Sequence, residues 1–405
     1  MNQVYALGVD WSDEKHEVCV LDEVGVEVLG RSFKESADGF AELGCILDEW
    51  SMNDIDLVAC IEKPDGRVID LLLDHNVKLF PVNPKGVKGA RNIHRSSGGR
   101  SDAFDAFVLA DFIRTHWQTL TPILPNSPQI AELKILTRSY AQQMRHRNRL
   151  ILQLRQTLKS FFRRPLEVFS DLSRPSFRGF LKQVQTPQQL EKLSRYKFFT
   201  YAKKYRLGNK EELWEKLKQP QLMVPEHISR PQARAAQTLL RELDLAHKEV
   251  EAYRKAIEAF FDNLPVAEIA KTLPGGKSGI MIPSLWAELG DGQHRWESFR
   301  HLQASSGAVP LTDQSGNYKA TKYRFACNKR LRYLSTTLAD YSIIESIWAR
   351  TYYDQQKKRG KSHRQASRAL ASKWLKIIYV MWRDQVPYDE NLHLANLYRQ
   401  NENLR

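Results

Sequence analysis

The 405-residue sequence has few cysteines, fewer acidic than basic residues, and no long apolar run. Its four cysteines, Cys19, Cys45, Cys60 and Cys327, are scattered and never form a CxxC pair. This spacing argues against a zinc module or a disulfide framework and favours a reducing compartment. No apolar stretch is long enough to span a membrane, and the first residues lack a signal-peptide pattern. We therefore expect a cytoplasmic protein with no membrane partner.

The shortage of acidic charge points to a polyanionic partner. Lysine and arginine exceed aspartate and glutamate by 14, and the isoelectric point is about 9.5. Nucleic acid is the commonest partner of so basic a protein, although an acidic lipid surface would also fit this charge. The length is sufficient for two or three domains with their own cores.

The first 125 residues alternate strand patterns with helix patterns. We expect strands at residues 4–10, 16–22, 26–33, 56–61 and 77–82, and helices at 37–50, 66–75 and 103–117. Three strands in a meander, a helix, and then strand–helix–strand–helix is the element order of a ribonuclease-H-like domain. The sequence thus predicts an α/β domain with a mixed sheet, of the ribonuclease-H-like type.

Four acids in this region stand at the ends of the expected elements. Asp10 ends the first strand and Glu62 follows the fourth, while Asp102 and Asp105 share one face at the start of the last helix. A carboxylate at the end of a buried strand is costly unless a cation or hydrogen bonds compensate it. Asp10 could instead cap the turn that follows its strand, and each acid could have a separate surface role.

Four converging carboxylates would repel one another unless divalent ions lie between them. Carboxylate oxygens suit Mg²⁺ or Mn²⁺, and two such ions can hold the attacking and leaving oxygens in phosphoryl transfer. We therefore predict that Asp10, Glu62, Asp102 and Asp105 form a metal-binding catalytic tetrad.

A segment between the fifth strand and the last helix carries only positive charge. Residues 84–100 contain four glycines and five basic residues without an acid, namely Lys85, Lys88, Arg91, Arg95 and Arg100. This composition predicts a flexible cationic loop suited to phosphate contacts, although an ordinary solvated loop is the alternative.

Two long helical patterns follow, at about residues 128–162 and 231–261. Their apolar stripes predict an antiparallel coiled-coil arm, or a pairing between chains, and a basic patch interrupts the first stripe at Arg145, Arg147 and Arg149. The stretch between them, about 163–226, is broken by prolines and combines aromatic with basic residues. It predicts a small helical insert that binds single-stranded or looped RNA, or else a small core with a basic rim.

The last region, from about residue 263, is expected to be mainly helical. A glycine-rich turn at residues 272–279 precedes an apolar helix, but its spacing is not that of a Walker A loop. A later basic run contributes Lys319, Lys322 and Arg324 as candidate nucleic-acid contacts.

Several short motifs together resemble the DEDD transposases of insertion-sequence family one-ten, whose relatives are the Piv-type DNA invertases. In the first half they are GVDWS at 8–12, IEKP at 61–64 and SDAFDA at 101–106. In the second half they are LPGG at 273–276, GD at 290–291, Phe299, SGAVP at 306–310 and QSG at 314–316. The family motif usually carries Gly-Leu before the proline, where this chain has Gly307-Ala308-Val309-Pro310.

The resemblance implies a recombinase with three parts. These are a RuvC-like domain at 1–125, a coiled-coil arm with its insert at 126–262, and a transposase domain at 263–405. By motif, Ser315 matches the family's nucleophile, which forms a covalent phosphoserine intermediate with DNA while the tetrad holds Mg²⁺.

The family also implies partners. They are target and donor DNA, a structured noncoding guide (bridge) RNA, and further copies of the chain in a dimer to tetramer. The place of action would be the nucleoid of a bacterial or archaeal cell.

Two other functions remain compatible with the sequence. The tetrad alone could hydrolyse DNA in a metal-dependent RuvC-like nuclease or resolvase, with Ser315 structural. Alternatively, the chain could be a non-catalytic nucleic-acid-binding protein that keeps the fold.

Overall fold

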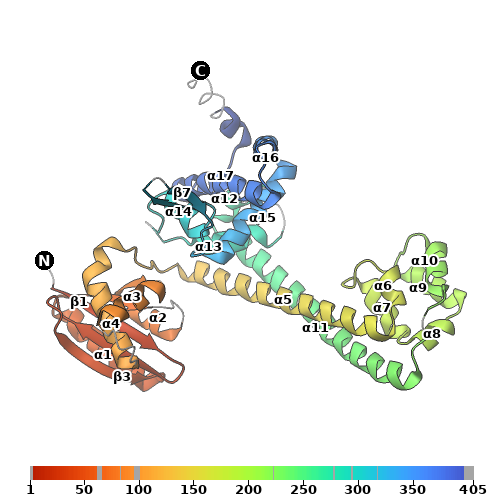
Figure 1. The fold of residues 1–405 in the computed structure, drawn as a ribbon, viewed down its shortest axis with the longest axis horizontal. Coiled ribbons are helices and arrows are strands. Elements are labelled where there is room, and N and C mark those ends of the chain that lie inside the picture. Colours follow the sequence, from red (N-terminus) through yellow and green to blue (C-terminus); the bar gives the residue numbers. More distant parts are fainter. Residues whose placement is uncertain are drawn as a thin grey trace. The chain divides into compact units, whose positions relative to one another are not determined.

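The computed structural model describes residues 3–61, 66–82, 84–94, 101–221, 223–276, 279–292, 295–316 and 318–395, with the backbone alone at 84, 85 and 319. The chain folds as two compact units (Figure 1). One comprises Met1–Asn126 with Gly292–Arg295, and the other Ser127–Asp291 with Trp296–Arg405. Among the described helices, none has both the length and the apolar content needed to cross a membrane.

A five-stranded mixed sheet forms the centre of the first unit (Figure 1). Its strands are β1 (Gln3–Trp11), β2 (Lys15–Leu21), β3 (Glu27–Lys34), β4 (Ile55–Ile61) and β5 (Lys78–Pro81). They lie in the order β3-β2-β1-β4-β5, with β2 antiparallel to β1 and β3, and with β4 parallel to β1 and β5. All five lie at the expected positions, with ends shifted by one residue at most. This topology is compatible with a ribonuclease-H-like domain.

Helices cover both faces of this sheet, as the alternation of side chains along β1 requires. Leu7 and Val9 share a core with α1 (Ala37–Met52) and α2 (Arg67–Asp74). Ala6, on the opposite face, packs in a core with α3 (Pro84–His94) and α4 (Asp102–His116), after which the short 3₁₀ helix η1 (Trp117–Thr119) follows. Because Asp10 has the same parity as Ala6, it belongs to the face that α4 covers.

The expectation of a flexible loop at 84–100 is wrong for its first part. Residues 84–94 form α3, which begins at a proline, a residue suited to the first turn. Val87 is fully buried and shares a core with Val108 of α4, so tertiary packing overrides the weak helix propensity of the two glycines. Residues 95–100 lie outside the described residues.

The described part of the second unit is largely helical, with a two-stranded hairpin. Its first helices are α5 (Pro128–Phe161), α6 (Arg164–Val168), α7 (Pro175–Gln183), α8 (Pro187–Glu191), α9 (Arg195–Lys204), α10 (Lys210–Lys218) and α11 (Glu226–Asp262). The later elements are α12 (Ala267–Ala270), α13 (Met281–Leu289), α14 (Phe299–Ser306), β6 (Leu311–Ser315), β7 (Tyr318–Lys322), α15 (Lys329–Glu345), α16 (Ile347–Lys358) and α17 (His363–Asp384). The hairpin β6–β7 was not anticipated from the sequence.

The two long helices α5 and α11 pack against each other in opposite directions, and each end of the pair enters a different core (Figure 1). Ile130 and Leu133 of α5 join Ile257 and Phe261 of α11 in a core with α13 to α17. At the other end, the second half of α5 and the first half of α11 form a core with α6 to α10. The predicted apolar stripes therefore face each other within one chain.

The described residues between these helices form five short helices, where the sequence predicted a small helical insert. Prolines that were interpreted as breaks are helix starts: Pro165, Pro175 and Pro187 each occupy one of the first two positions of a helix. Helices of 5 to 10 residues contain too few turns for their apolar period to be recognised.

His247 of α11 titrates outside the ordinary range of a histidine. Burial, reinforced by the charges of Arg178 and Arg147, lowers the pKa of His247 to about 4. In an unfolded chain the pKa of a histidine is about 6.5. As the pH falls below that value, the unfolded state therefore takes up the proton first, and the free energy of unfolding decreases toward pH 4.

We expect His247→Leu to flatten this acid-side loss of stability. At pH 5 the variant should have a higher free energy of unfolding than the wild type, and at pH 7 the two values should be closer. Urea unfolding at both pH values measures them. The exposed His227 on the same helix supplies the control, since His227→Leu should not alter the pH dependence. An unchanged pH dependence in His247→Leu would contradict the assignment.

Candidate functional site

A close approach of helix α4 to strand β1 positions the first acid of the predicted tetrad. A Cβ atom on Gly8 would lie 2.0 Å from the carbonyl oxygen of Ala106 and 2.4 Å from the amide nitrogen of Ala110. Only glycine therefore allows the helix to rest on the strand at this point. Asp10, two residues further along β1, lies on the same face and is partly buried.

Two more acids of the predicted tetrad occupy the first turn of α4. Asp102 is exposed, whereas the side chain of Asp105 is only 15% exposed. Ser101 caps this turn by accepting a hydrogen bond of 3.2 Å from the amide of Phe104, and serine is a preferred residue at this position. The fourth acid, Glu62, lies outside the described residues, and β4 ends at the preceding residue, Ile61.

Two residues of β2, Lys15 and Glu17, lie beside these acids and were not predicted from the sequence. Glu17 pairs across the strands with Asp10. The ammonium group of Lys15 lies 2.8 Å from Glu17 Oε1 and 3.8 Å from Asp102 Oδ2, and thus links the sheet to the start of α4. The neighbouring Glu17 carboxylate raises the pKa of Lys15. The alternation of residues 15, 17 and 19 was a usable signal, but only the strand register shows that Glu17 adjoins Asp10.

Asp105 has a cationic partner from α3. Its Oδ1 lies 2.7 Å from Nε of Arg91, and both side chains are largely buried. Arg91 was predicted as a nucleic-acid contact. The structure places its guanidinium group against Asp105 and does not test that role, which stays a prediction.

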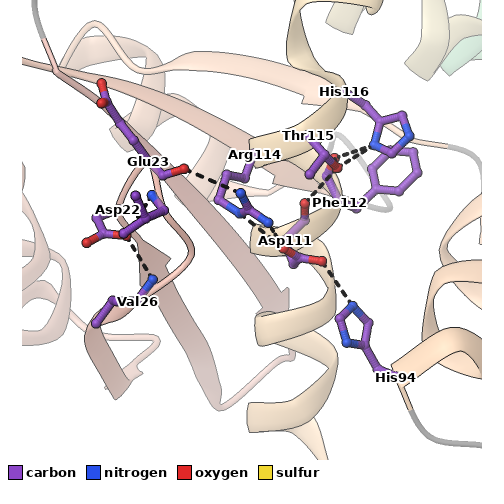
Figure 2. A network of polar contacts seen from close by, with 10 residues as sticks. Asp22, Glu23, Val26, His94, Asp111, Phe112, Arg114, Thr115 and His116 are labelled. Atoms are coloured by element: carbon purple, nitrogen blue, oxygen red, sulfur yellow. Dashed lines mark hydrogen bonds and ion pairs between the residues drawn. The ribbon is translucent and has the colours of Figure 1, made fainter.

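A further acid of α4, Asp111, has a structural role (Figure 2). It accepts two hydrogen bonds from Arg114 and pairs with His94 of α3 at 3.0 Å. Arg114 also donates to the carbonyl oxygen of Glu23, in the turn between β2 and β3. These contacts join α3, α4 and the sheet, and they hold α4 at one end while its first turn carries the acids.

The residues of this acidic cluster fit a divalent cation in chemistry. Asp10, Glu17, Asp102 and Asp105 offer only carboxylate oxygens, and the cations Lys15 and Arg91 already lie against three of these acids. Among the described residues, no three potential ligands come close enough together to hold a metal ion. The predicted set includes Glu62, which is not among them.

The other predicted nucleic-acid contacts are dispersed. Lys88 is exposed on α3, and on α5 Arg145 and Arg149 are exposed while Arg147 is partly buried. In the second unit, Lys322 pairs with Asp313 across the hairpin, and Nε of Arg324 donates to the Val309 carbonyl at 3.4 Å. The side chains of Lys85 and Lys319, and all of Arg95 and Arg100, lie outside the described residues.

Ser315 ends strand β6 at the tip of the hairpin. It pairs with Tyr318, and Gly316 follows it with a φ of +54°, a left-handed value that favours glycine in a tight turn. The Ser315 side chain is exposed, and within the described part of the chain its hydroxyl forms no hydrogen bond. The described contacts thus assign this hydroxyl no structural task.

Two family models match the chain in separate regions. Residues 7–163 match a transposase model for DEDD proteins of IS110, and residues 267–354 match the "Transposase IS116/IS110/IS902 family" model. Together they match more than half of the chain. The chain belongs to the IS110 family of transposases. This confirms the resemblance to insertion-sequence family one-ten and makes the chain an enzyme of DNA recombination.

Individual relatives agree with this assignment. The transposase is 26% identical to a candidate transposase of the IS117 mini-circle from Streptomyces coelicolor, over 96% of each chain. It is 25% identical to the 43.6 kDa protein of insertion element IS110 from the same organism, over 72% of this chain and 73% of that protein. A pilin gene-inverting protein of Moraxella bovis is 27% identical over 31% of this chain and 40% of its own length.

Proposed function

We propose that this transposase is an RNA-guided DNA recombinase that cuts and rejoins DNA through a covalent phosphoserine intermediate. The observation that carries the proposal is the exposed side chain of Ser315 at the tip of the β6–β7 hairpin, whose hydroxyl forms no hydrogen bond with the residues that the structure describes. A hydroxyl at such a position can reach a phosphodiester without first breaking a contact within the protein.

In the proposed reaction, Oγ of Ser315 attacks the phosphorus atom and loses its proton. The phosphorus–oxygen bond to one deoxyribose breaks, and that sugar oxygen takes up a proton. Attack by the hydroxyl of an exchanged strand then restores a phosphodiester and releases the serine. The described residues place no histidine against Ser315, so the proton must leave by another route.

We assign the predicted tetrad of Asp10, Glu62, Asp102 and Asp105 to binding Mg²⁺ or Mn²⁺. The bound ion would lower the pKa of the attacking hydroxyl and stabilise developing negative charge. Lys15 and Arg91 compensate the carboxylates in its absence, which is the function we assign to their contacts with Asp102 and Asp105.

The remaining finer assignments are also proposals. We propose a coiled-coil arm formed by α5 and α11, and domains at 1–125, 126–262 and 263–405. We further propose a structured noncoding RNA that selects target and donor DNA by base pairing, and a dimer to tetramer of the chain. The excess of 14 positive charges supports binding to polyanions of either kind.

A metal-dependent nuclease is the second candidate. It is favoured by the position of the described acids of the cluster, Asp10, Glu17, Asp102 and Asp105, which all belong to the first unit. A RuvC-like domain of this composition could hydrolyse DNA by itself.

A covalent-adduct assay tests the proposal. The protein is incubated with the noncoding RNA that flanks its gene, labelled cognate DNA and Mg²⁺, and is then separated under denaturing conditions. We expect a labelled protein band that requires all three components. A DNA product without any covalent adduct would favour the nuclease, and an adduct that forms without the RNA would refute guidance.

The contacts of Lys15 and Glu17 give a second test, which does not depend on activity. Lys15→Met should increase the affinity for Mn²⁺, and Glu17→Gln should decrease it, each by roughly fivefold, because each changes one unit charge beside the carboxylates. Isothermal titration calorimetry measures both. Lys78→Met is the matched control, because Lys78 pairs with Asp56 at 3.1 Å on the same sheet and should leave the affinity unchanged. Equal affinities in all four proteins would refute the assignment of the cluster to metal.

A further inference from the structure

The insert between α5 and α11 uses most of its aromatic residues in its own core. Phe198 and Tyr201 of α9 are at most 4% exposed, and Phe198 packs against Trp214 with ring centroids 5.5 Å apart. One aromatic residue of α9 differs: Tyr196 is 81% exposed. The alternative of a core with a basic rim therefore describes this insert well, except at Tyr196.

Tyr196 borders a pocket on the surface of α9. Tyr196, Thr200 and Lys204 follow one another at intervals of four residues and lie on one face of the helix. Lys192 and Lys197 complete the cationic part of the lining, and Gln189 contributes an amide. The cavity volume is about 520 Å³, which is within the range of roughly 300–1,000 Å³ that holds small-molecule groups in proteins.

Three lysines of this pocket lack the acidic partners that several other cations of the insert possess. Residues 192–206 contain six lysines and arginines and no acid. Within the described part of the chain, none of Lys192, Lys197 and Lys204 forms an ion pair with a carboxylate. By contrast, Lys182 pairs with Asp244, and Lys216 pairs with Glu212. Three positive charges without a carboxylate partner among the described residues therefore line the pocket.

We propose that this pocket binds an unpaired nucleotide of a single-stranded nucleic acid. The ring of Tyr196 offers a free face on which a base can stack, and the three lysines can neutralise the adjoining phosphates. The Gln189 amide can hydrogen-bond to a base edge. A duplex hides the faces of its bases, so it can use the lysines but not the tyrosine. The pocket lies far along the sequence from Asp10 and Ser315, and the inference does not depend on the serine mechanism.

The test is a binding measurement on the full-length protein in EDTA, where no strand can be cut. Fluorescence anisotropy is recorded with oligo(U) RNA and oligo(dT) DNA of about 12 nucleotides, and with a duplex of about 20 base pairs. We expect Tyr196→Ala to weaken single-strand binding by about tenfold, as expected for the loss of one stacked base, and to leave duplex binding unchanged. Since Tyr196 is 81% exposed, its removal should not disturb the core.

Charge is tested with a matched pair of double variants. Lys197→Ala with Lys204→Ala removes two pocket lysines, whereas Lys203→Ala with Lys216→Ala removes two that do not line the pocket. We expect only the first to weaken single-strand binding by more than about tenfold. Equal losses in both doubles would mean general electrostatics and would overturn the proposal. So would unchanged single-strand binding in Tyr196→Ala.

The two oligonucleotides identify the source of the strand. A larger effect with oligo(U) identifies RNA, and a larger effect with oligo(dT) identifies DNA; both support the pocket. Photocrosslinking of 5-iodouridine RNA or 5-iododeoxyuridine DNA should then label the peptide that contains Tyr196. Absence of that peptide from the crosslinks of both strands would contradict the proposal. Because no metal is present, this result stands whether or not the covalent adduct forms.

Discussion

Replacing Ser315 with alanine should eliminate the covalent protein–DNA adduct and reduce strand exchange by at least about 10³-fold. The variant removes the atom that we propose to form the bond with phosphorus. Binding of DNA should persist, because the exposed hydroxyl makes no hydrogen bond within the described part of the chain. The adduct is measured with labelled DNA on a denaturing gel, and binding by anisotropy.

The hairpin itself supplies a matched control. Thr312→Ala removes another exposed hydroxyl from the same strand and should leave the adduct intact. Ser315→Cys places a different nucleophile, a thiol, at the same position. It should restore part of the adduct, detectable as a phosphorothiolate with a phosphorus–sulfur bond. If Ser315→Ala still forms the adduct, another residue is the nucleophile. If it loses the adduct but cleaves DNA at the wild-type rate, the nuclease function is correct.

The second large effect concerns stability. Glu288 of α13 is a charged residue with a side chain that is 0% exposed. Its carboxylate accepts two hydrogen bonds from Arg138 of α5, at 3.0 and 3.2 Å, and one of 3.0 Å from Asn328, the residue that caps α15. Arg330 lies 3.2 Å away as an ion pair. One carboxylate therefore joins three helices.

Glu288→Ala should lower the free energy of unfolding by about 3 kcal/mol, because it leaves buried donors without their acceptor. We place the loss at the lower end of the range for buried pairs, since Arg138 is 54% exposed and can turn to water. Urea denaturation measures the change. The surface pair of Arg350 with Asp354 is the control, and Asp354→Ala should cost less than about 1 kcal/mol. Similar losses in both variants would contradict a special role for Glu288.

The contacts of Glu288 also predict that the free energy of unfolding depends on pH. Burial raises the pKa of Glu288, but the hydrogen bonds from Arg138 and Asn328 together with the positive charges of Arg138 and Lys134 outweigh burial and hold the pKa below its ordinary value. The stabilisation is then fully present above the pKa that a glutamate has in an unfolded chain, and it decreases as the pH falls toward the lower folded value. Glu288→Gln should lose part of this acid sensitivity.

The sequence by itself determined the order of strands and helices in the first unit. The central strands β1 and β4 are short continuous apolar runs, which is the local signal of a strand buried on both faces. The same local signals determined where the acids stand: Asp10 at the end of a strand, and Asp102 and Asp105 beside a serine that caps a helix. Ser315 was different, because a serine before a glycine is common in turns, and only the family motif distinguished it.

Tertiary structure alone decided which of these residues have partners. Local periodicity assigns a side chain to a face, but it does not say what lies against that face. The pairing of Glu17 with Asp10 depends on the register of two strands, and the position of α4 depends on the absence of a side chain at Gly8. The burial of Glu288 and the exposure of Tyr196 likewise follow from contacts between distant segments, which have no signature in the residues around them.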